Sequence, residues 1–273
     1  MRPAAKPWPR PGETKLPKNV LKARLAAGEQ VYGAWVGTGA TVNAEIMGHI
    51  GYDFLVIDHE HGLGELSQAV DSLRAAEAGG TPCIVRAPWN DQVWLKRILD
   101  AGGNSIMIPS VENAEEALAA IRACRYPPHG TRGYAASVVR GSRYGLETGY
   151  AHAAKDETLV ILQIESGAAA EQAEKICALD GIDVVFIGVN DLACSLGYME
   201  QLDHPEVRRV VTKLEDVILA SGKPMGTVPN AGADWRSLFK RGYKLVVGPH
   251  DGAMLRDSAR NAWADYQSFK AGR

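Results

Sequence analysis

The sequence predicts an α/β protein that folds as a closed (β/α)8 barrel, a TIM barrel, and three observations lead to this prediction. Short apolar runs rich in valine and isoleucine recur along the chain without alternating polar residues, as is typical of strands buried on both faces of a parallel sheet. Longer segments with helical spacing separate these runs. Eight such repeats in about 240 residues match the usual size of this barrel.

Each strand is expected where one apolar run lies. In chain order the runs are Val31–Val36, Phe54–Ile57, Cys83–Val85, Ser105–Pro109, Leu159–Ile164, Val184–Ile187, Met225–Val228 and Leu245–Val247. The strand–helix alternation implies right-handed βαβ units. An open doubly wound sheet is the alternative, but it usually shows a GxGxxG turn after its first strand, and Gly33–Gly37 does not match that pattern.

Helices are expected between the strands. The clearest spacing of three and four is at Val207, Val210, Val211, Leu214, Val217 and Ile218. Leu95, Ile98 and Leu99 predict a shorter helix that ends at Gly102 and Gly103. A last helix is expected over Ala253–Lys270, packed against the barrel, although Trp263 and Tyr266 would also suit an oligomer interface.

Two segments depart from the repeat. Residues 1–18 are rich in proline and lysine without an apolar core, so we expect a flexible N-terminal arm rather than a secretory signal, followed by one domain over residues 19–273. The connection Arg125–Asp156 has no strong apolar period and carries five glycines. Because long connections inside a compact domain tend to be functional, we expect it to fold over the mouth of the barrel as an active-site loop after the fourth strand.

Composition excludes several classes of protein. Lys plus Arg is 30 and Asp plus Glu is 32, giving a net charge of -2, so neither nucleic acid nor a membrane surface is an expected partner. No apolar stretch reaches the length of a transmembrane helix. The four cysteines are far apart without a CxxC pair, which argues against a zinc knuckle and fits free thiols in the cytoplasm.

Polar residues follow the predicted strands, at the end of the barrel where chemistry takes place. In order they are Trp35, Asp58-His59-Glu60-His61, Arg86, Ser110, Gln163 and Glu165, Asn190 and Asp191, Pro229 and His250. None of the 12 lysines falls at such a position, which disfavours a Schiff-base enzyme.

Glu165 and Asp191 close sequential strands, so their carboxylates can converge. Two carboxylates with open positions suit a hard divalent ion that also takes water and substrate oxygens, and we favour this over two ordinary loop acids. Gly188-Val189-Asn190-Asp191 opens a helix, and the N–H groups there can bind a small carboxylate, although most helix starts bind only water or a cap.

Three further residues are candidates for catalysis. Asp58 is placed to hold the imidazole N–H of His61 and leave its other nitrogen as a base, with His59 and Glu60 as competitors. Arg86 suits a carboxylate or an enolate oxygen, or forms an ion pair with Asp58 or Glu165. Asp100 opposes the helix dipole near a helix end, which indicates either a tolerated surface acid or a role outside its own helix.

Several motifs together resemble the HpcH/HpaI class II aldolases, pyruvate-dependent enzymes of the phosphoenolpyruvate/pyruvate barrel superfamily. The resemblance runs from about Gly33 to Leu255. It is carried by Gly33-Ala34-Trp35, Asp58-His59-Glu60-His61, Arg86-Ala87-Pro88-Trp89-Asn90-Asp91, Arg125-Tyr126-Pro127-Pro128, Arg132-Gly133, Gln163-Ile164-Glu165 and Phe186-Ile187-Gly188-Val189-Asn190-Asp191-Leu192. The chain departs from the family in having His59 where a glycine is usual, and Val189-Asn190 where Pro-Ala is usual.

The resemblance implies that Glu165 and Asp191 bind the metal (Mg²⁺, Mn²⁺ or Co²⁺) and that His61, oriented by Asp58, acts in acid/base catalysis. It places Arg86 on the pyruvate enolate oxygen, and Trp35 and Gln163 in the pocket. It further implies a dimer-based homo-oligomer, with a hexamer as one candidate, in which Asp100 reaches a neighbour's active site and the C-terminal helix is exchanged between subunits.

The expected function is that of a lyase that cleaves or forms a 4-hydroxy-2-oxo acid, with pyruvate and an aldehyde as the small-molecule partners. Two alternatives remain open. One keeps the same enolate chemistry but decarboxylates oxaloacetate, and the other is a barrel that only binds a keto acid.

Overall fold

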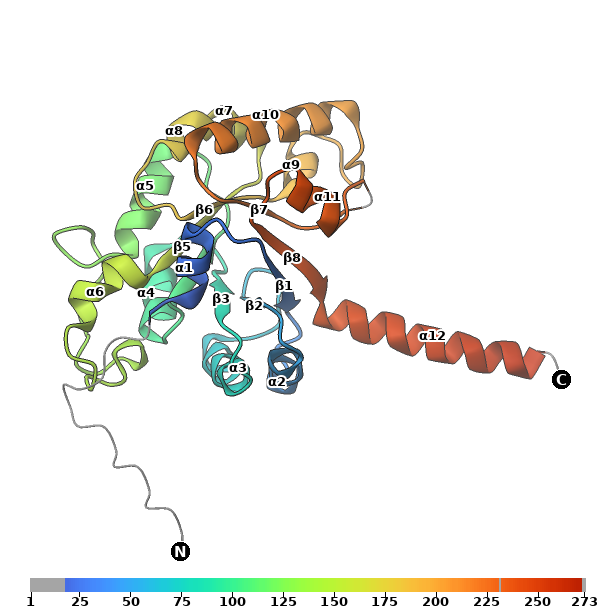
Figure 1. The fold of residues 1–273 in the computed structure, drawn as a ribbon, viewed down its shortest axis with the longest axis horizontal. Coiled ribbons are helices and arrows are strands. Elements are labelled where there is room, and N and C mark those ends of the chain that lie inside the picture. The colour runs from blue at the N-terminus through green and yellow to red at the C-terminus, as the bar shows by residue number, and fades with distance from the viewer. Residues whose placement is uncertain (1–17, 231, 272–273) are drawn as a thin grey trace, which may run out of the picture.

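The computed structural model describes residues 18–230 and 232–271, and its eight strands close into a parallel barrel in chain order (Figure 1). The strands are β1 (Val31–Val36), β2 (Phe54–Asp58), β3 (Cys83–Arg86), β4 (Ser105–Ile108), β5 (Leu159–Ile164), β6 (Val184–Ile187), β7 (Met225–Thr227) and β8 (Leu245–His250). Each predicted run is therefore a strand, and the predicted barrel is confirmed.

The helices surround this barrel. They are α1 (Val20–Ala26), α2 (Thr41–Ile50), α3 (Leu66–Ala78), α4 (Gln92–Asp100), α5 (Ala114–Ala123), the 3-10 helix η1 (Arg140–Ser142), α6 (Tyr150–Glu157), α7 (Gly167–Glu171), α8 (Ala173–Cys177), α9 (Val189–Ser195), α10 (Pro205–Ser221), α11 (Trp235–Lys240) and α12 (Asp251–Ala271). Of these, none is long and apolar enough to cross a membrane.

Local sequence explains where α10 begins and ends. Pro205 occupies its first turn, where a missing N–H costs nothing, and the His204 side chain accepts the Glu206 N–H. Val207 and Leu214 lie on the buried face, as their spacing predicts. The helix ends at Gly222, whose φ of 73° is easily adopted only without a Cβ.

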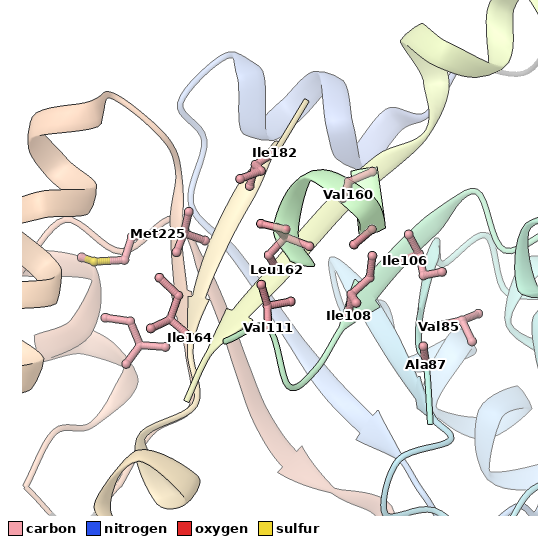
Figure 2. Close-up of a cluster of buried hydrophobic side chains, with 14 of the residues drawn as sticks. Val85, Ala87, Ile106, Ile108, Val111, Val160, Leu162, Ile164, Ile182 and Met225 are labelled. Carbon is pink, nitrogen blue, oxygen red and sulfur yellow. The ribbon is translucent and has the colours of Figure 1, made fainter. Parts of the chain in front are cut away.

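The core has two layers. Inside the barrel, Val31, Phe54 and Met107 pack together, and Leu21 of α1 joins them to close the end at which the strands begin. The second layer lies between the barrel and the helices, and Figure 2 shows part of it. Its labelled members are Val85, Ala87, Ile106, Ile108, Val111, Val160, Leu162, Ile164, Ile182 and Met225.

The pairing of β1 with β8 contains a register shift. Gly33 pairs with Val247, but two residues further along β1, Trp35 pairs with His250 rather than with residue 249. The irregularity places a histidine beside Trp35 at the end of the strands.

The prediction that the connection Arg125–Asp156 covers the barrel mouth is wrong. Within the chain, this segment lies at the opposite end, where the strands begin. Arg140 donates to the Ala101 carbonyl at 3.1 Å and pairs with Glu77 at 3.0 Å, both near the ends of helices that run back from the mouth. The reason is the order of the elements, because the connection follows α5 and precedes β5. A connection that leads from a helix into the next strand lies at the end of the barrel where the strands begin.

The C-terminal helix α12 is also not packed as predicted. It leaves the barrel beside β8 and extends away from it (Figure 1). Trp263 is 61% exposed and Tyr266 is 51% exposed. Among the described residues of this helix, Asp251 alone is buried. Its aromatic residues therefore do not belong to the core of their own barrel.

Candidate active site

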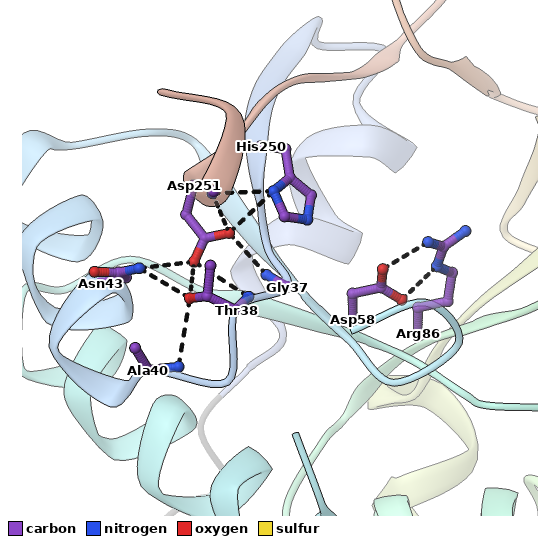
Figure 3. Close-up of polar contacts among 9 residues, drawn as sticks. Gly37, Thr38, Ala40, Asn43, Asp58, Arg86, His250 and Asp251 are labelled. Atoms are coloured by element: carbon purple, nitrogen blue, oxygen red, sulfur yellow. Dashed lines mark hydrogen bonds and ion pairs between the residues drawn. The ribbon is translucent and has the colours of Figure 1, made fainter. Parts of the chain in front are cut away.

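Asp58 and Arg86 are register partners at the ends of β2 and β3. The Arg86 Nε donates to Asp58 Oδ1 and its Nη2 donates to Asp58 Oδ2, both at 2.8 Å (Figure 3). Burial raises the pKa of Asp58, but the hydrogen bonds and charge of Arg86 outweigh this effect, so the pKa is lowered. The ion pair anticipated for Arg86 is therefore formed with Asp58.

Glu60 approaches the same guanidinium from the following loop. Its Oε2 lies 2.8 Å from Arg86 Nη1, but the atom receives no well-directed hydrogen bond from the described residues. Burial raises the pKa of Glu60 to about 7, with Arg86 opposing the shift and the carboxylate of Glu165 adding to it. Asp58 and Glu60 thus both contact the guanidinium of Arg86. The ring of Trp35 lies 4.4 Å from the Arg86 Cζ and completes this corner of the mouth.

His61 meets Asp58 through its backbone, not through its ring. The Asp58 Oδ1 accepts the N–H of Glu60 at 3.0 Å and that of His61 at 3.4 Å, while both carboxylate oxygens bind Arg86. The expected bond from Asp58 to the imidazole is therefore replaced by the pair with Arg86, and His61 is exposed.

The competing histidine is fixed in the loop instead. His59 Nδ1 lies 2.7 Å from the Gly64 carbonyl, so this nitrogen carries the hydrogen. Its Nε2 is buried without a partner among the described residues.

Glu165 is buried at the end of β5, with 7% of its surface exposed. Its Oε1 accepts the Ser110 N–H at 2.6 Å, and its Oε2 accepts the Gln163 side-chain amide. Ser110 adopts φ 54°, a strained conformation for a residue with a side chain, and this aims its N–H at Glu165. Burial raises the pKa of Glu165, and the nearby charge of Asp191 adds to that effect.

Gly188 makes room for this carboxylate. A Cβ at position 188 would lie 2.7 Å from both Cβ and Oε2 of Glu165, so only a glycine fits here without displacing Glu165. Asn190 and Asp191 follow in the first turn of α9, and both are exposed. The substrate contacts expected of Gly188 and Asn190 stay predictions.

The residues present fit a hard divalent cation. Glu165 and Asp191 offer two carboxylates close enough to affect each other, and the buried Gln163 Oε1 beside them has no hydrogen-bond partner in the described chain. No group of three His, Cys, Asp or Glu residues gathers there within residues 18–230 and 232–271. A cation at this place would complete its coordination with water and substrate oxygens, as Mg²⁺ commonly does.

Asp100 lies at the other end of the barrel. It pairs with Arg132, whose Nη2 is 2.7 Å from Asp100 Oδ1, and the Arg132 side chain is fully buried against the Tyr126 ring. The positive charge of Arg132 offsets the unfavourable interaction of Asp100 with the dipole of α4. Asp100 therefore does form a contact outside its own helix. Its expected part in a neighbour's active site stays a prediction.

One cluster at the mouth was not predicted. Asp251 accepts hydrogen bonds from the Gly37 N–H at 3.1 Å, from the Thr38 hydroxyl and from the Asn43 amide at 2.9 Å, and its Oδ1 lies 3.2 Å from His250 Nδ1 (Figure 3). Burial raises the pKa of Asp251, but these hydrogen bonds outweigh it and lower the pKa. The signal that could have revealed it is an acid directly after the last strand, at the end of the barrel where polar residues gather.

Comparison with known proteins gives a consistent result. The family model described as HpcH/HpaI aldolase/citrate lyase matches residues 32–257. A hydroxypyruvate/pyruvate aldolase of Agrobacterium fabrum (strain C58 / ATCC 33970) is 35% identical over 93% of this chain and 96% of its own length. A 5-keto-4-deoxy-D-glucarate aldolase of Enterobacter sp. (strain 638) is 35% identical over 92% and 97%. The crystal structure of an HpcH/HpaI aldolase/citrate lyase family protein from Burkholderia cenocepacia J2315 superposes with a TM-score of 0.87 at 33% identity, covering 91% of this chain and 99% of that one.

Proposed function

Because the chain belongs to the HpcH/HpaI aldolase/citrate lyase family, we propose that it cleaves a 4-hydroxy-2-oxo acid into pyruvate and an aldehyde, or catalyses the reverse reaction. The expected class, a carbon–carbon lyase of this family, is confirmed by about 35% identity to pyruvate aldolases over most of the chain. The observation that carries the specific proposal is the buried Glu165 carboxylate, which lies within electrostatic reach of both Asp191 and Arg86 at one barrel mouth.

Glu165 and Asp191 would hold a divalent cation, Mg²⁺, Mn²⁺ or Co²⁺. When bound, such a cation supplies a Lewis acid that polarises the 2-keto group. Gln163 would position Glu165 through the amide that donates to Oε2, and the Ser110 N–H would fix the other carboxylate oxygen.

Arg86 would stabilise the oxygen that becomes negative as the C3–C4 bond breaks. Two of its five N–H groups bind Asp58, which holds the plane of the guanidinium fixed before the substrate arrives. The Trp35 ring supports the same group from one side. Charge stabilisation by a group that is already fixed needs no reorganisation during the reaction.

His61 would take the proton from the 4-hydroxyl and return one to C3. Asp58 acts here as a positioning residue, because it binds the backbone of the loop that carries His61 and the side chain of Arg86. Exposure of His61 at the mouth leaves its ring accessible to a substrate.

The proposal includes a dimer-based homo-oligomer in the cytoplasm, in which Asp100 serves a neighbour's site and the exposed aromatic residues of α12 contact another subunit. Trp263 and Tyr266 support this, since aromatic side chains are enriched at interfaces.

A panel of 4-hydroxy-2-oxo acids, with oxaloacetate included, tests the function. We expect pyruvate and aldehyde to be released from a hydroxy-oxo acid, the release to stop with a chelator, and Mg²⁺, Mn²⁺ or Co²⁺ to restore it. Carbon dioxide release from oxaloacetate alone would indicate a decarboxylase, and pyruvate trapped on the protein by borohydride would contradict the metal-dependent mechanism.

A further inference from the structure

Arg132 is a buried cation in the connection Arg125–Asp156, and the proposed mechanism gives it no part. Its side chain is fully buried, and its Cζ lies 4.5 Å from the ring of Tyr126 and 5.8 Å from that of Tyr150. Its Nη2 donates to Asp100 Oδ1 at 2.7 Å and to the Tyr150 hydroxyl at 3.2 Å. The one acid that it contacts is therefore the residue proposed to serve a neighbour's site.

The surroundings of Arg132 leave part of its guanidinium without partners. Its Nε and Nη1 are buried and receive no hydrogen-bond acceptor from residues 18–230 and 232–271. A buried N–H group without an acceptor destabilises a fold, and apolar side chains in place of a buried ion pair are often neutral or stabilising. Stability alone is therefore a poor reason for a cation at this position, whereas its hydrogen bond to Asp100 fixes the direction of a carboxylate.

The same connection contacts the end of α4 on both sides of Asp100. Arg140 Nη1 donates to the Ala101 carbonyl at 3.1 Å. A Cβ at Gly141 would lie 2.8 Å from the Leu99 carbonyl oxygen, so the backbone passes directly against the helix there. Three successive residues of α4 and its cap are thus in contact with the connection, which restricts movement of the last turn. The positive charges also suit the carboxyl end of a helix.

Asp100 is held through one oxygen while its side chain still reaches the surface. Arg132 binds Oδ1, and 21% of the Asp100 side chain is exposed. A carboxylate that acts across an interface has to be aimed outward, and a group fixed before the partner arrives avoids the entropy cost of ordering it then. A buried guanidinium behind a partly exposed carboxylate provides this arrangement.

We propose that Arg132 is a positioning residue for the active site of the neighbouring subunit, which it serves by fixing the carboxylate of Asp100. The inference rests on the proposed role of Asp100 in a neighbour's site. It also gives the connection Arg125–Asp156 a function at an active site, although this segment lies at the end of its own barrel where the strands begin.

Single variants provide the first measurement. Arg132→Gln should lower kcat about 10²-fold with little change in KM, the effect expected when a catalytic group is displaced by about 1 Å. Arg132→Lys keeps the charge without the planar fork and should recover part of the rate. Arg122→Gln, at an exposed arginine of α5, is the matched control and should equal the wild type. Thermal melting and size-exclusion chromatography check folding and assembly, and Arg132→Lys replaces the glutamine variant throughout if that variant unfolds.

Mixed oligomers then separate positioning from other roles. Arg132→Gln subunits mixed with His61→Ala subunits should regain activity, because the first supply His61 and the second supply an Asp100 that is held correctly. Arg132→Gln subunits mixed with Asp100→Ala subunits should not, because every Asp100 in the mixture then lacks its arginine. A role of Arg132 within its own active site predicts the reverse of both results.

Mixtures of His61→Ala with Asp100→Ala subunits are the reference. Where these regain activity, restoration of Arg132→Gln by Asp100→Ala subunits, or no restoration by His61→Ala subunits, would overturn the role of Arg132 and leave that of Asp100 intact. Wild-type kcat in Arg132→Gln alone would do the same. A reference mixture that stays inactive despite demonstrated subunit exchange would overturn the proposed role of Asp100 and this inference with it.

Discussion

Asp58 and Arg86 are joined by two parallel hydrogen bonds of 2.8 Å between the ends of neighbouring strands. This geometry needs the planar fork of a guanidinium, and an ammonium group cannot reproduce it. The pair is nearly closed to solvent, with 10% of the Arg86 side chain and 3% of the Asp58 side chain exposed. The second hydrogen bond therefore fixes the orientation of the Arg86 guanidinium, which an ion pair with one hydrogen bond would leave free to rotate.

Arg86→Lys should therefore keep the charge and lose most of the activity. We expect kcat to fall about 10²- to 10³-fold, the usual effect of removing one donor to a developing negative charge. Steady-state kinetics with a hydroxy-oxo acid measures this. Arg208→Lys, at an exposed arginine of α10, is the matched control. Equal kcat values for the two variants would show that the paired geometry is unimportant.

His61→Ala and His59→Ala separate the two histidines of one loop. His61→Ala should lose about 10²- to 10⁴-fold in rate as a missing acid/base group, with metal affinity retained by calorimetry. His59→Ala removes the contact to Gly64 and should lower the free energy of unfolding by about 1 kcal/mol, the value of an ordinary hydrogen bond, with a much smaller loss of rate. The opposite order of rates would assign the base to His59.

The eight strands were predictable because short, continuous valine- and isoleucine-rich runs are typical of strands buried on both faces. An ion pair of Arg86 with either Asp58 or Glu165 was one of the alternatives that the sequence offered, and the structure shows the pair with Asp58. The direction of the side chains in the loops that follow the strands was not predictable. Whether Asp58 binds the imidazole of His61 or the guanidinium of Arg86 depends on how the loop turns, and composition carries no signal for that. Likewise, residues 125–156 were misplaced because glycine content indicates an irregular segment but not the end of the barrel at which it lies.

Gly188→Ala should weaken metal binding without straining the backbone, since φ at position 188 is -82° and suits alanine. The added methyl group would push against the Glu165 carboxylate, so we expect Mg²⁺ affinity to fall about tenfold or more, in the range seen when the residues around metal ligands are disturbed. Calorimetric titration measures it. In the control, Gly133→Ala, the methyl group meets only the flexible Lys96 side chain at 3.4 Å. Unchanged affinity in Gly188→Ala would remove Glu165 from the metal site.

Mixing two inactive variants tests whether Asp100 serves a neighbour. His61→Ala and Asp100→Ala subunits should each be inactive alone, and a mixed oligomer should regain activity because one of its sites contains both residues. Arg132 makes the test specific, since its ion pair at 2.7 Å keeps Asp100 in place within its own subunit. Inactive mixtures despite demonstrated subunit exchange, or an active monomer, would show that Asp100 serves only in its ion pair with Arg132.

Asp251→Asn should destabilise the protein in a pH-dependent way. The folded-state pKa of Asp251 lies below its ordinary value of 3.8, so its carboxylate stabilises the fold above about pH 4, and this contribution disappears as the pH falls through the folded-state pKa. The unfolding free energies of variant and wild type should differ by about 1.5–3 kcal/mol at pH 7, as for hydrogen bonds to a charged group, and converge below pH 4. Chemical denaturation at several pH values checks this, and a difference that is constant down to pH 3 would contradict it.

The register shift between β1 and β8 has a consequence for how this barrel can acquire new chemistry. Continued pairing in phase with Gly33 and Val247 would bring Pro249 beside Trp35, whereas the irregularity brings His250 there. A single insertion or deletion in β8 would thus exchange the group presented to the mouth without altering any other strand. Related barrels can therefore come to prefer different substrates when one strand shifts its register by a residue. A comparison of amino-acid identities at aligned positions would not reveal such a change.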